Sequence, residues 1–440
     1  MRKYRLFTLI LLVMAISFSI CSCTENDEDG KSNYPTKTLN VYNWGEYISD
    51  EDDAECGLFD VNSAFEEYFN DNLADKYGYY IKVNYSTYAT NEDMYAKITN
   101  SAVAYDIIVP SDYMIERMIA EGLLLEINTD ALDNYKNISE DFLGLDYDPD
   151  NKYSVPYTYG MLGIIYNAEF VAEEDLADKS WGLLWNENYK GKILQFNNPR
   201  DAFGTAMYWK NIDINSKNPD DWNKALDLLK EQKPLLQGYV NDEIFNKMKG
   251  ASAYIAPYFA GDFLTMAAEN EDLNFYYPAE GTNYFVDAMC IPTTSKNPDA
   301  AHEYINYMIS LEAATANALY IGYASPNKAV TESPEYKTLL AENYDTDYIS
   351  AWEILYGKNK NEANENYSYP PAYKSFDKDI QVHVNTLWES LKTENSTEPW
   401  IHVTSIAIVV GVLAISVYNT YIKKKRSKDY RLRDKLKKNS

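Results

Sequence analysis

Short β-type runs alternate with helix-type segments in the first third of the chain, and this alternation most constrains the fold. Between the β-type runs, apolar residues recur at helical spacing in 59–74, in 91–98 with Asn91 as N-cap, and in 113–120. Strands separated by helices predict a largely parallel α/β sheet. In such sheets ligands meet the loops at the carboxyl ends of the strands. The β-type runs are 39–44, 79–85 and 105–110, and the loops are 43–47 and 110–113.

A second α/β region is expected from about Gly160 to Asn283. The chain then continues through a strand-type run at 284–289, and a helix opens at 297–299. With 440 residues and 46% hydrophobic content, the chain is long enough for two domains that each have a core. Within the second region we expect strands at 192–196 and 253–256 and a helix at 222–229.

The first 23 residues are typical of a secretory signal. A basic start is followed by an apolar run over 6–20 that is too short to span a bilayer comfortably. The sequence Ile20-Cys21-Ser22-Cys23 is similar to a bacterial lipobox, with Cys23 as the lipidated residue. Cys21 fits less well, because the bulky Ile20 precedes it. The polar stretch 24–37 is expected to be a flexible tether.

The segment 400–422 carries no formal charge and has a β-branched, apolar centre. As a helix it covers roughly 34 Å, which predicts one transmembrane helix. A buried core helix is the alternative, but the segment has no charged face to turn toward water. The basic stretch 423–440 follows directly, so the positive-inside rule predicts a cytoplasmic tail and an extracytoplasmic body.

Charge and tyrosine content narrow the class of ligand. The formal net charge is −27 although the C-terminal end is basic, so the body is strongly acidic. Such a body repels phosphate backbones, which argues against nucleic acid, and attracts cations. The 41 tyrosines offer π faces and hydroxyls together, which suit polar or cationic small molecules. The alternative interpretation is that tyrosine simply fills core positions.

Motifs for catalysis, metals and cofactors are absent from the sequence. None of the three histidines belongs to a zinc-protease pattern, and no nucleophile elbow, phosphate loop or dinucleotide fingerprint occurs. We therefore predict no enzyme, no metal site and no cofactor. An exported glycosidase that uses two carboxylates stays open as an alternative. Outside the signal region only Cys56 and Cys290 remain, and they could pair outside the cytoplasm.

Several segments, in order along residues 38–330, resemble the spermidine/putrescine-binding proteins, the solute receptors of bacterial ABC polyamine importers. The first four are Tyr42-Asn43-Trp44-Gly45-Glu46-Tyr47, Tyr85-Ser86-Thr87-Tyr88, Asn91-Glu92-Asp93-Met94-Tyr95-Ala96-Lys97 and Tyr105-Asp106-Ile107-Ile108-Val109-Pro110-Ser111. The others are Val155-Pro156-Tyr157, Trp185 with Tyr189-Lys190-Gly191, Asp287-Ala288 with Ile291-Pro292, and Ile321-Gly322-Tyr323-Ala324-Ser325-Pro326-Asn327.

This resemblance implies a two-lobed, periplasmic-binding-protein-like fold of type II that closes over its ligand like a hinged clamp. Lobe 1 is expected to take 38–157 and to resume over about 287–330, and lobe 2 to take 160–284. The C-terminal helices of 298–395 are expected to pack on the lobes.

A polyamine needs carboxylates or carbonyls to replace the water around each ammonium, and aromatic walls for its methylenes. The resemblance implies that Trp44, Tyr47 and Tyr323 are wall or hydrogen-bonding residues, with Ser111 and Tyr113 on the facing loop. It implies that Asp201 and Asp287 bind amines. Three positions depart from the family pattern. Asn198 stands where an aspartate is frequent, Phe285 replaces a tryptophan, and a further tryptophan falls at Tyr258 or Phe259. These departures leave the preferred polyamine length open.

The sequence therefore predicts a membrane-held, extracytoplasmic receptor that captures putrescine or spermidine between its lobes. Its expected partners are the ligand, an ABC permease with its cytoplasmic ATPase, and the lipid bilayer. The alternatives are a receptor for another small cationic or organic solute and a membrane-held ligand sensor.

Overall fold

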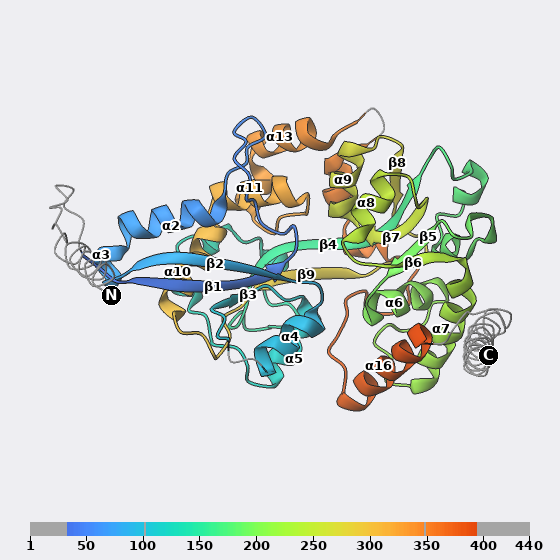
Figure 1. The fold of residues 1–440 in the computed structure, drawn as a ribbon, viewed down its shortest axis with the longest axis horizontal. Coiled ribbons are helices and arrows are strands. Elements are labelled where there is room, and N and C mark those ends of the chain that lie inside the picture. The colour runs from blue at the N-terminus through green and yellow to red at the C-terminus, as the bar shows by residue number, and fades with distance from the viewer. Residues whose placement is uncertain (1–32, 101–102, 347–348, 394–440) are drawn as a thin grey trace, which may run out of the picture.

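Two β-sheets organise the part of the chain that the computed structural model describes, which is residues 33–100, 103–346 and 349–393. Lobe 1 is built on the sheet β2-β1-β3, and lobe 2 on the sheet β6-β5-β7-β4-β8. The two lobes lie at opposite ends of an elongated molecule, with β4 and β9 running between them (Figure 1).

Lobe 1 has a parallel sheet, as the alternating pattern predicts. The α2 sequence shows why a helix covers this sheet. Asp60 caps the helix by accepting a hydrogen bond from the Ser63 backbone N–H, and Val61, Phe65 and Phe69 are buried along one face. The elements are β1 (Thr36–Trp44), α2 (Val61–Asn72), α3 (Ala74–Tyr77), β2 (Tyr80–Tyr88), α4 (Asn91–Asn100), β3 (Ile107–Ile108) and α5 (Asp112–Ala120).

Lobe 2 has a mixed sheet, unlike the parallel sheet of lobe 1. Strand β5 runs parallel to β6 and β7, but β4 runs antiparallel to β7 and β8. The reason is that β4 enters lobe 2 from the other lobe instead of through a βαβ unit. The elements are β5 (Ile193–Phe196), α6 (Pro199–Trp209), α7 (Pro219–Gln232), β6 (Leu236–Val240), α8 (Glu243–Lys249), β7 (Ile255–Phe259), α9 (Ala260–Glu269) and β8 (Leu273–Tyr276).

Two antiparallel strands, β4 (Val155–Asn167) and β9 (Tyr284–Met289), cross between the lobes. The first half of β4 pairs with β9, and its second half belongs to the sheet of lobe 2. After β9 the chain returns to lobe 1, where Cys290 bridges Ile108 and Pro292 bridges Leu124. The crossing strands therefore connect the two sheets directly.

The C-terminal helices pack on both lobes. Helices α10 (Pro298–Met308) and α11 (Leu311–Ile321) contact α2, while α13 (Pro334–Tyr344) and α14 (Ala351–Tyr356) contact α9. The last described helix, α16 (Lys378–Thr393), lies against α6 and α7 (Figure 1). The remaining short helices are α12 (Lys328–Glu332) and α15 (Lys360–Ala363), with 3-10 turns at Thr129–Ala131, Tyr135–Asn137, Glu140–Phe142, Glu173–Leu176, Trp181–Trp185, Glu187–Tyr189 and Lys233–Leu235.

Two local expectations need correction, and one open question is answered. Strand β1 begins at Thr36, two residues inside the stretch expected to be a tether. Asn91 is not the N-cap of α4. Instead the Thr90 hydroxyl accepts the Asp93 N–H, and the buried Asn91 amide bonds Ser111. The pairing of Cys56 with Cys290, which the sequence leaves open, does not occur here: both are free thiols, one half-buried and one fully buried.

Among the described residues, no helix combines the length and the apolar character that a membrane crossing requires. The predicted signal segment 1–23 with Cys23, the predicted membrane span 400–422 and the basic stretch 423–440 all lie outside the described residues.

Candidate ligand-binding site

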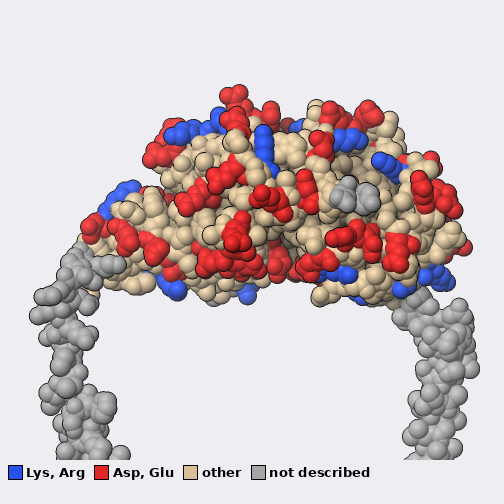
Figure 2. All heavy atoms as spheres, turned by 90° about the horizontal axis from the view of Figure 1, so that it is seen from above, with Lys and Arg blue, Asp and Glu red and all other residues tan. Residues whose placement is uncertain are grey.

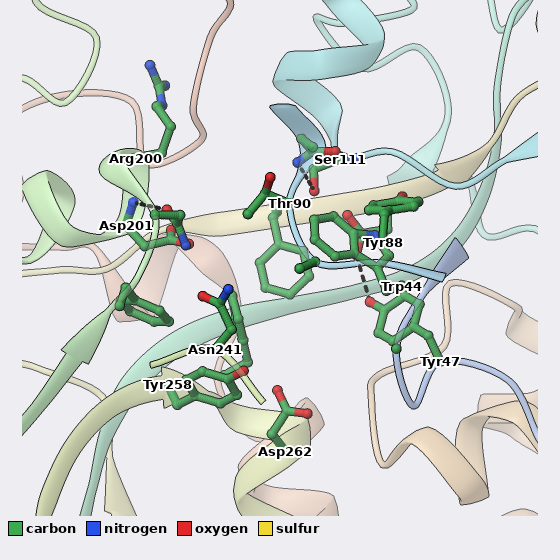
Figure 3. Close-up of a pocket in the computed structure, with 18 of the residues that line it drawn as sticks. Trp44, Tyr47, Tyr88, Thr90, Ser111, Arg200, Asp201, Asn241, Tyr258 and Asp262 are labelled. Carbon is green, nitrogen blue, oxygen red and sulfur yellow. Dashed lines mark hydrogen bonds between the residues drawn. The ribbon is translucent and has the colours of Figure 1, made fainter. Parts of the chain in front are cut away.

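A cavity lies between the two lobes, with about 1010 Å³ of empty space including its solvent-open mouth. Both lobes and the crossing strands line it, and Figure 3 shows Trp44, Tyr47 and Ser111 of lobe 1 across from Asp201 and Asp262 of lobe 2. All eleven residues predicted for the site line this one cavity: Trp44, Tyr47, Ser111, Tyr113, Asn198, Asp201, Tyr258, Phe259, Phe285, Asp287 and Tyr323. Their role in binding stays a prediction.

The lobe 1 wall is formed where β1 and β3 end, as expected for a parallel sheet. Trp44 is the last residue of β1, and its indole N–H donates to the Val109 carbonyl over 2.9 Å. Its ring packs against Tyr88, with 4.6 Å between ring centroids. This hydrogen bond and ring contact fix the indole at the cavity wall.

Asp287 presents a buried carboxylate from the crossing strand β9. It lies within β9, where its Oδ2 accepts a 2.6 Å hydrogen bond from the Tyr47 hydroxyl, which also bonds Thr158. The Asp287 side chain is 4% exposed, and its Oδ1 has no hydrogen-bond partner among the described residues. Burial raises the pKa of Asp287 to about 6, although the Ser111 and Tyr47 side chains favour its charged form. An oxygen that is buried and unpartnered suits a bound ammonium.

Asp201 presents a second carboxylate from the first turn of α6. Asn198 is the N-cap of this helix, since its Oδ1 accepts the Asp201 N–H over 2.9 Å. The amide nitrogen of Asn198 also donates to Asp201 Oδ2 over 2.9 Å. Burial raises the pKa of Asp201 to about 6. This acid therefore already has a neutral partner, unlike Oδ1 of Asp287.

Aromatic rings close the cavity between the two acids. Phe285 meets Phe259 in a T-shaped contact at 5.3 Å and Tyr323 at 6.1 Å. Tyr258 and Phe259 both line the cavity, and their rings are 5.0 Å apart. Both candidates for the missing tryptophan are thus present at the wall. Such rings suit methylene chains and attract cations.

Sequence reasoning missed several acids of the cavity. Asp262, in the first turn of α9, accepts a 2.6 Å hydrogen bond from the Tyr323 hydroxyl, and burial raises its pKa to about 7. Glu92 accepts from the Tyr113 hydroxyl over 3.1 Å, and burial raises its pKa as well. A signal existed for both. Glu92 lies inside a segment that resembles the family, and Asp262 follows the aromatic pair 258–259 by three residues.

Arg200 is the one Lys or Arg among the described residues that line the cavity, against seven acids. The acids are Glu46, Glu92, Asp112, Asp201, Asp242, Asp262 and Asp287. Acidic side chains are also spread widely over the outer face in Figure 2. A cavity with low-dielectric walls and so many carboxylates concentrates cations. The arrangement favours a small, elongated cation.

This fold and site define a class of protein. The model of the bacterial extracellular solute-binding protein family matches residues 64–342, and the chain belongs to this family.

Within it, the chain is similar to proteins named for polyamines. It is 29% identical over 365 residues to the spermidine/putrescine-binding periplasmic protein of Escherichia coli, covering 82% of this chain and 94% of that protein. It is 30% identical over 338 residues to the protein of the same name from Salmonella typhimurium, covering 76% and 88%. Among solved structures, the spermidine/putrescine ABC transporter substrate-binding protein of Streptococcus pneumoniae superimposes with a TM-score of 0.61 at 32% identity, covering 81% and 98%.

Proposed function

We propose that this protein is an extracytoplasmic receptor that captures a polyamine between its lobes and delivers it to an ABC permease. The similar proteins named above support the ligand class. The receptor itself has no catalytic task in this proposal. The permease and its ATPase are the expected downstream partners.

The observation that carries the proposal is the unpartnered Oδ1 of buried Asp287. A buried carboxylate oxygen without a donor is costly, and an ammonium is the donor that also neutralises the charge. Asp201 and Asp262 supply further acids along the same aromatic cavity. Several acids along one cavity match a chain that carries ammonium groups separated by methylenes.

A calorimetric titration of the full chain in detergent tests the proposal. The ligands are putrescine, spermidine, spermine, lysine, arginine and the uncharged diol 1,4-butanediol. We expect saturable binding of at least one polyamine and no binding of the diol. Binding of a basic amino acid in place of every polyamine would favour the alternative of a receptor for another cationic solute.

We further propose that the receptor is held at the membrane by a lipid on Cys23 and by a transmembrane helix over 400–422, with 423–440 in the cytoplasm. The apolar, charge-free span and the basic stretch after it support this topology. Cys23→Ala should abolish acyl labelling and leave the protein membrane-bound. Release of that variant into the medium would show that 400–422 is not an anchor.

A further inference from the structure

The segment 371–377, which we call the strap, lies between α15 and α16 and contacts both lobes. In Figure 1 it is part of the orange-red chain that passes between the α5 side of lobe 1 and α6 of lobe 2 before entering α16. Tyr373 of the strap is buried and lines the ligand cavity. The strap is therefore a third connection between the lobes, in addition to β4 and β9.

Most hydrogen bonds of the strap go to lobe 2. The Asn215 side chain binds both sides of Tyr373, donating to the Ala372 carbonyl over 2.9 Å and accepting the Lys374 N–H over 2.8 Å. Arg200 Nη2 donates to the Lys374 carbonyl over 3.1 Å, and the Tyr373 hydroxyl donates to the Arg200 carbonyl over 3.2 Å. These bonds attach the strap to lobe 2.

Contact with lobe 1 rests on fewer bonds. The Ser375 N–H donates to Glu116 Oε2 of α5 over 2.6 Å, and both residues are half-buried. The Lys374–Asp146 ion pair of 3.2 Å has side chains that are 46% and 90% exposed. Exposed pairs of this kind contribute little, whereas a hydrogen bond to a carboxylate that is shielded from water is a strong one. The Ser375–Glu116 bond is therefore the main polar link to lobe 1.

The guanidinium of Arg200 is held mainly by contacts with aromatic rings, two of which belong to the strap. Its guanidinium lies 3.7 Å from the Phe376 ring centroid, 4.3 Å from that of Tyr373 and 5.2 Å from that of Tyr113. The side chain is buried, and its Nε and Nη1 have no hydrogen-bond partner among the described residues. Close contact of one guanidinium with several aromatic rings is a property of arginine that lysine does not reproduce. Tyr113 belongs to lobe 1, so these rings bring strap, Arg200 and lobe 1 together.

We propose that Arg200 is a positioning residue that seats the strap on lobe 2, so that the strap latches onto Glu116 when the lobes close and must detach before ligand leaves. This inference rests on the proposed function for the identity of the ligand. It does not require Arg200 to touch the ligand. A latch that forms whenever the lobes are closed, with or without ligand, slows the dissociation of ligand and leaves its association nearly unchanged.

The test uses the full chain with three variants. Glu116→Ala removes the lobe 1 acceptor, Arg200→Lys keeps the charge without the stacking, and Lys374→Met is the control that removes only the exposed ion pair. We expect Glu116→Ala to raise the dissociation rate of putrescine about tenfold, with an association rate within twofold of the parent. Arg200→Lys should raise the same rate, and Lys374→Met should leave it within twofold.

Hydrogen exchange at the Ser375 amide gives a second measurement that does not depend on ligand binding. Exchange should be faster in Glu116→Ala than in the parent, and Arg200→Lys should speed it across 371–377. If no polyamine binds, the proposed function fails, while faster Ser375 exchange in Glu116→Ala still supports the latch. Unchanged exchange in Glu116→Ala, or an equal effect of Lys374→Met on the dissociation rate, would overturn the latch.

Discussion

Asp106 of lobe 1 and Asp287 of the crossing strand β9 are both buried carboxylates. Comparing them shows how an acid that stabilises the fold differs from an acid that is available to bind a ligand. Asp106 is fully buried, and protein donors occupy both of its oxygens. Oδ1 accepts from the Ser295 hydroxyl and from the Lys296 and Asn297 N–H groups, and Oδ2 accepts from the Asn40 N–H, all within 2.9 Å. Asp287 is equally enclosed, but its Oδ1 has no such donor.

The two carboxylates differ in the source of their hydrogen-bond donors. Asp106 joins β1 to the chain that returns after β9, so it stabilises the fold of lobe 1. Asp287 is left for an external donor, so its charge costs folding free energy until a cation arrives. Substitution at the two sites should therefore affect different quantities, stability for Asp106 and affinity for Asp287.

The largest effect is expected for Asp106→Asn. The new amide group of asparagine turns its N–H groups toward backbone N–H donors, so these donors lose their acceptor. Removing a buried carboxylate whose hydrogen bonds are all made lowers the free energy of unfolding by about 3–5 kcal/mol. Denaturant unfolding at neutral pH measures this loss. Polyamine affinity of the folded variant should stay within twofold. A variant that kept its stability but lost affinity would remove the contrast between the two acids.

Asp287→Asn should show the opposite pattern. Losing one partner of a desolvated charge pair costs about 2–5 kcal/mol, so calorimetry should show binding weaker by roughly 30-fold to several thousand-fold. Thermal stability of the ligand-free variant should be equal or higher at pH 7.5, because a buried charge is gone. Asp150→Asn, at a side chain that is 73% exposed, is the control and should bind within twofold. Affinity within threefold of the parent for Asp287→Asn would make this residue structural.

The affinity for polyamine should decrease as the pH is lowered through the range in which the acids of the cavity take up protons. The pKa is raised to about 6 in Asp287 and Asp201 and to about 7 in Asp262. A bound cation favours the charged forms, so binding releases protons below about pH 7.5, and we expect a loss of about 100-fold between pH 7.5 and 5.5. Titrations in two buffers of different ionisation enthalpy measure the released protons. A flat profile would exclude these acids from binding.

The same pKa shifts change stability in the opposite direction. Because these acids take up protons more readily when folded, their contribution to stability is complete below their ordinary pKa of 3.8 and is lost as pH rises through 6–7. Ligand-free protein should therefore gain thermal stability from these groups as pH falls from 7.5 to 5.5, while affinity decreases.

Asp201→Asn is expected to have the smallest effect, about a tenfold loss of affinity. Asn198 already donates to this carboxylate, so an ammonium gains less there than at Asp287. Calorimetry with putrescine and with the uncharged diol separates the charge effect from a change in shape. A loss as large as that of Asp287→Asn would mean that Asn198 does not compensate this acid.

Local sequence patterns predict the walls of lobe 1 well. Leu39 and Val41 are buried in β1, Trp44 is its last residue, and Tyr47 follows three residues later. Strand ends of this kind are local in sequence, so the residues that follow them can be assigned to the site. Asp287 is assigned to the site through the resemblance to the polyamine-binding family, and it lies within the strand β9.

Other parts of the site depend on distant contacts that no local pattern encodes. The direction of β4 in lobe 2 follows from its crossing between the lobes, which its apolar sequence does not reveal. Tyr373 reaches the cavity because Asn215 and Arg200 hold the strap in place. Both of these residues lie more than 150 positions before the strap in the chain. Arg200 is buried among rings that lie far apart in sequence, so its place among the acids could not be foreseen.

The shared strand β4 also has a consequence for the order of folding. The five strands β4 to β8 of the lobe 2 sheet lie between Val155 and Tyr276, so they emerge close together during synthesis or export. Lobe 1 is completed later, because β3 and Asp106 pair with β1 and in addition need Cys290 and Ser295–Asn297. Contacts over long sequence separations form slowly. We therefore expect lobe 2 to fold first. Strand β9 can then pair with β4 of the folded lobe 2, and this pairing brings the chain after β9 to the rest of lobe 1.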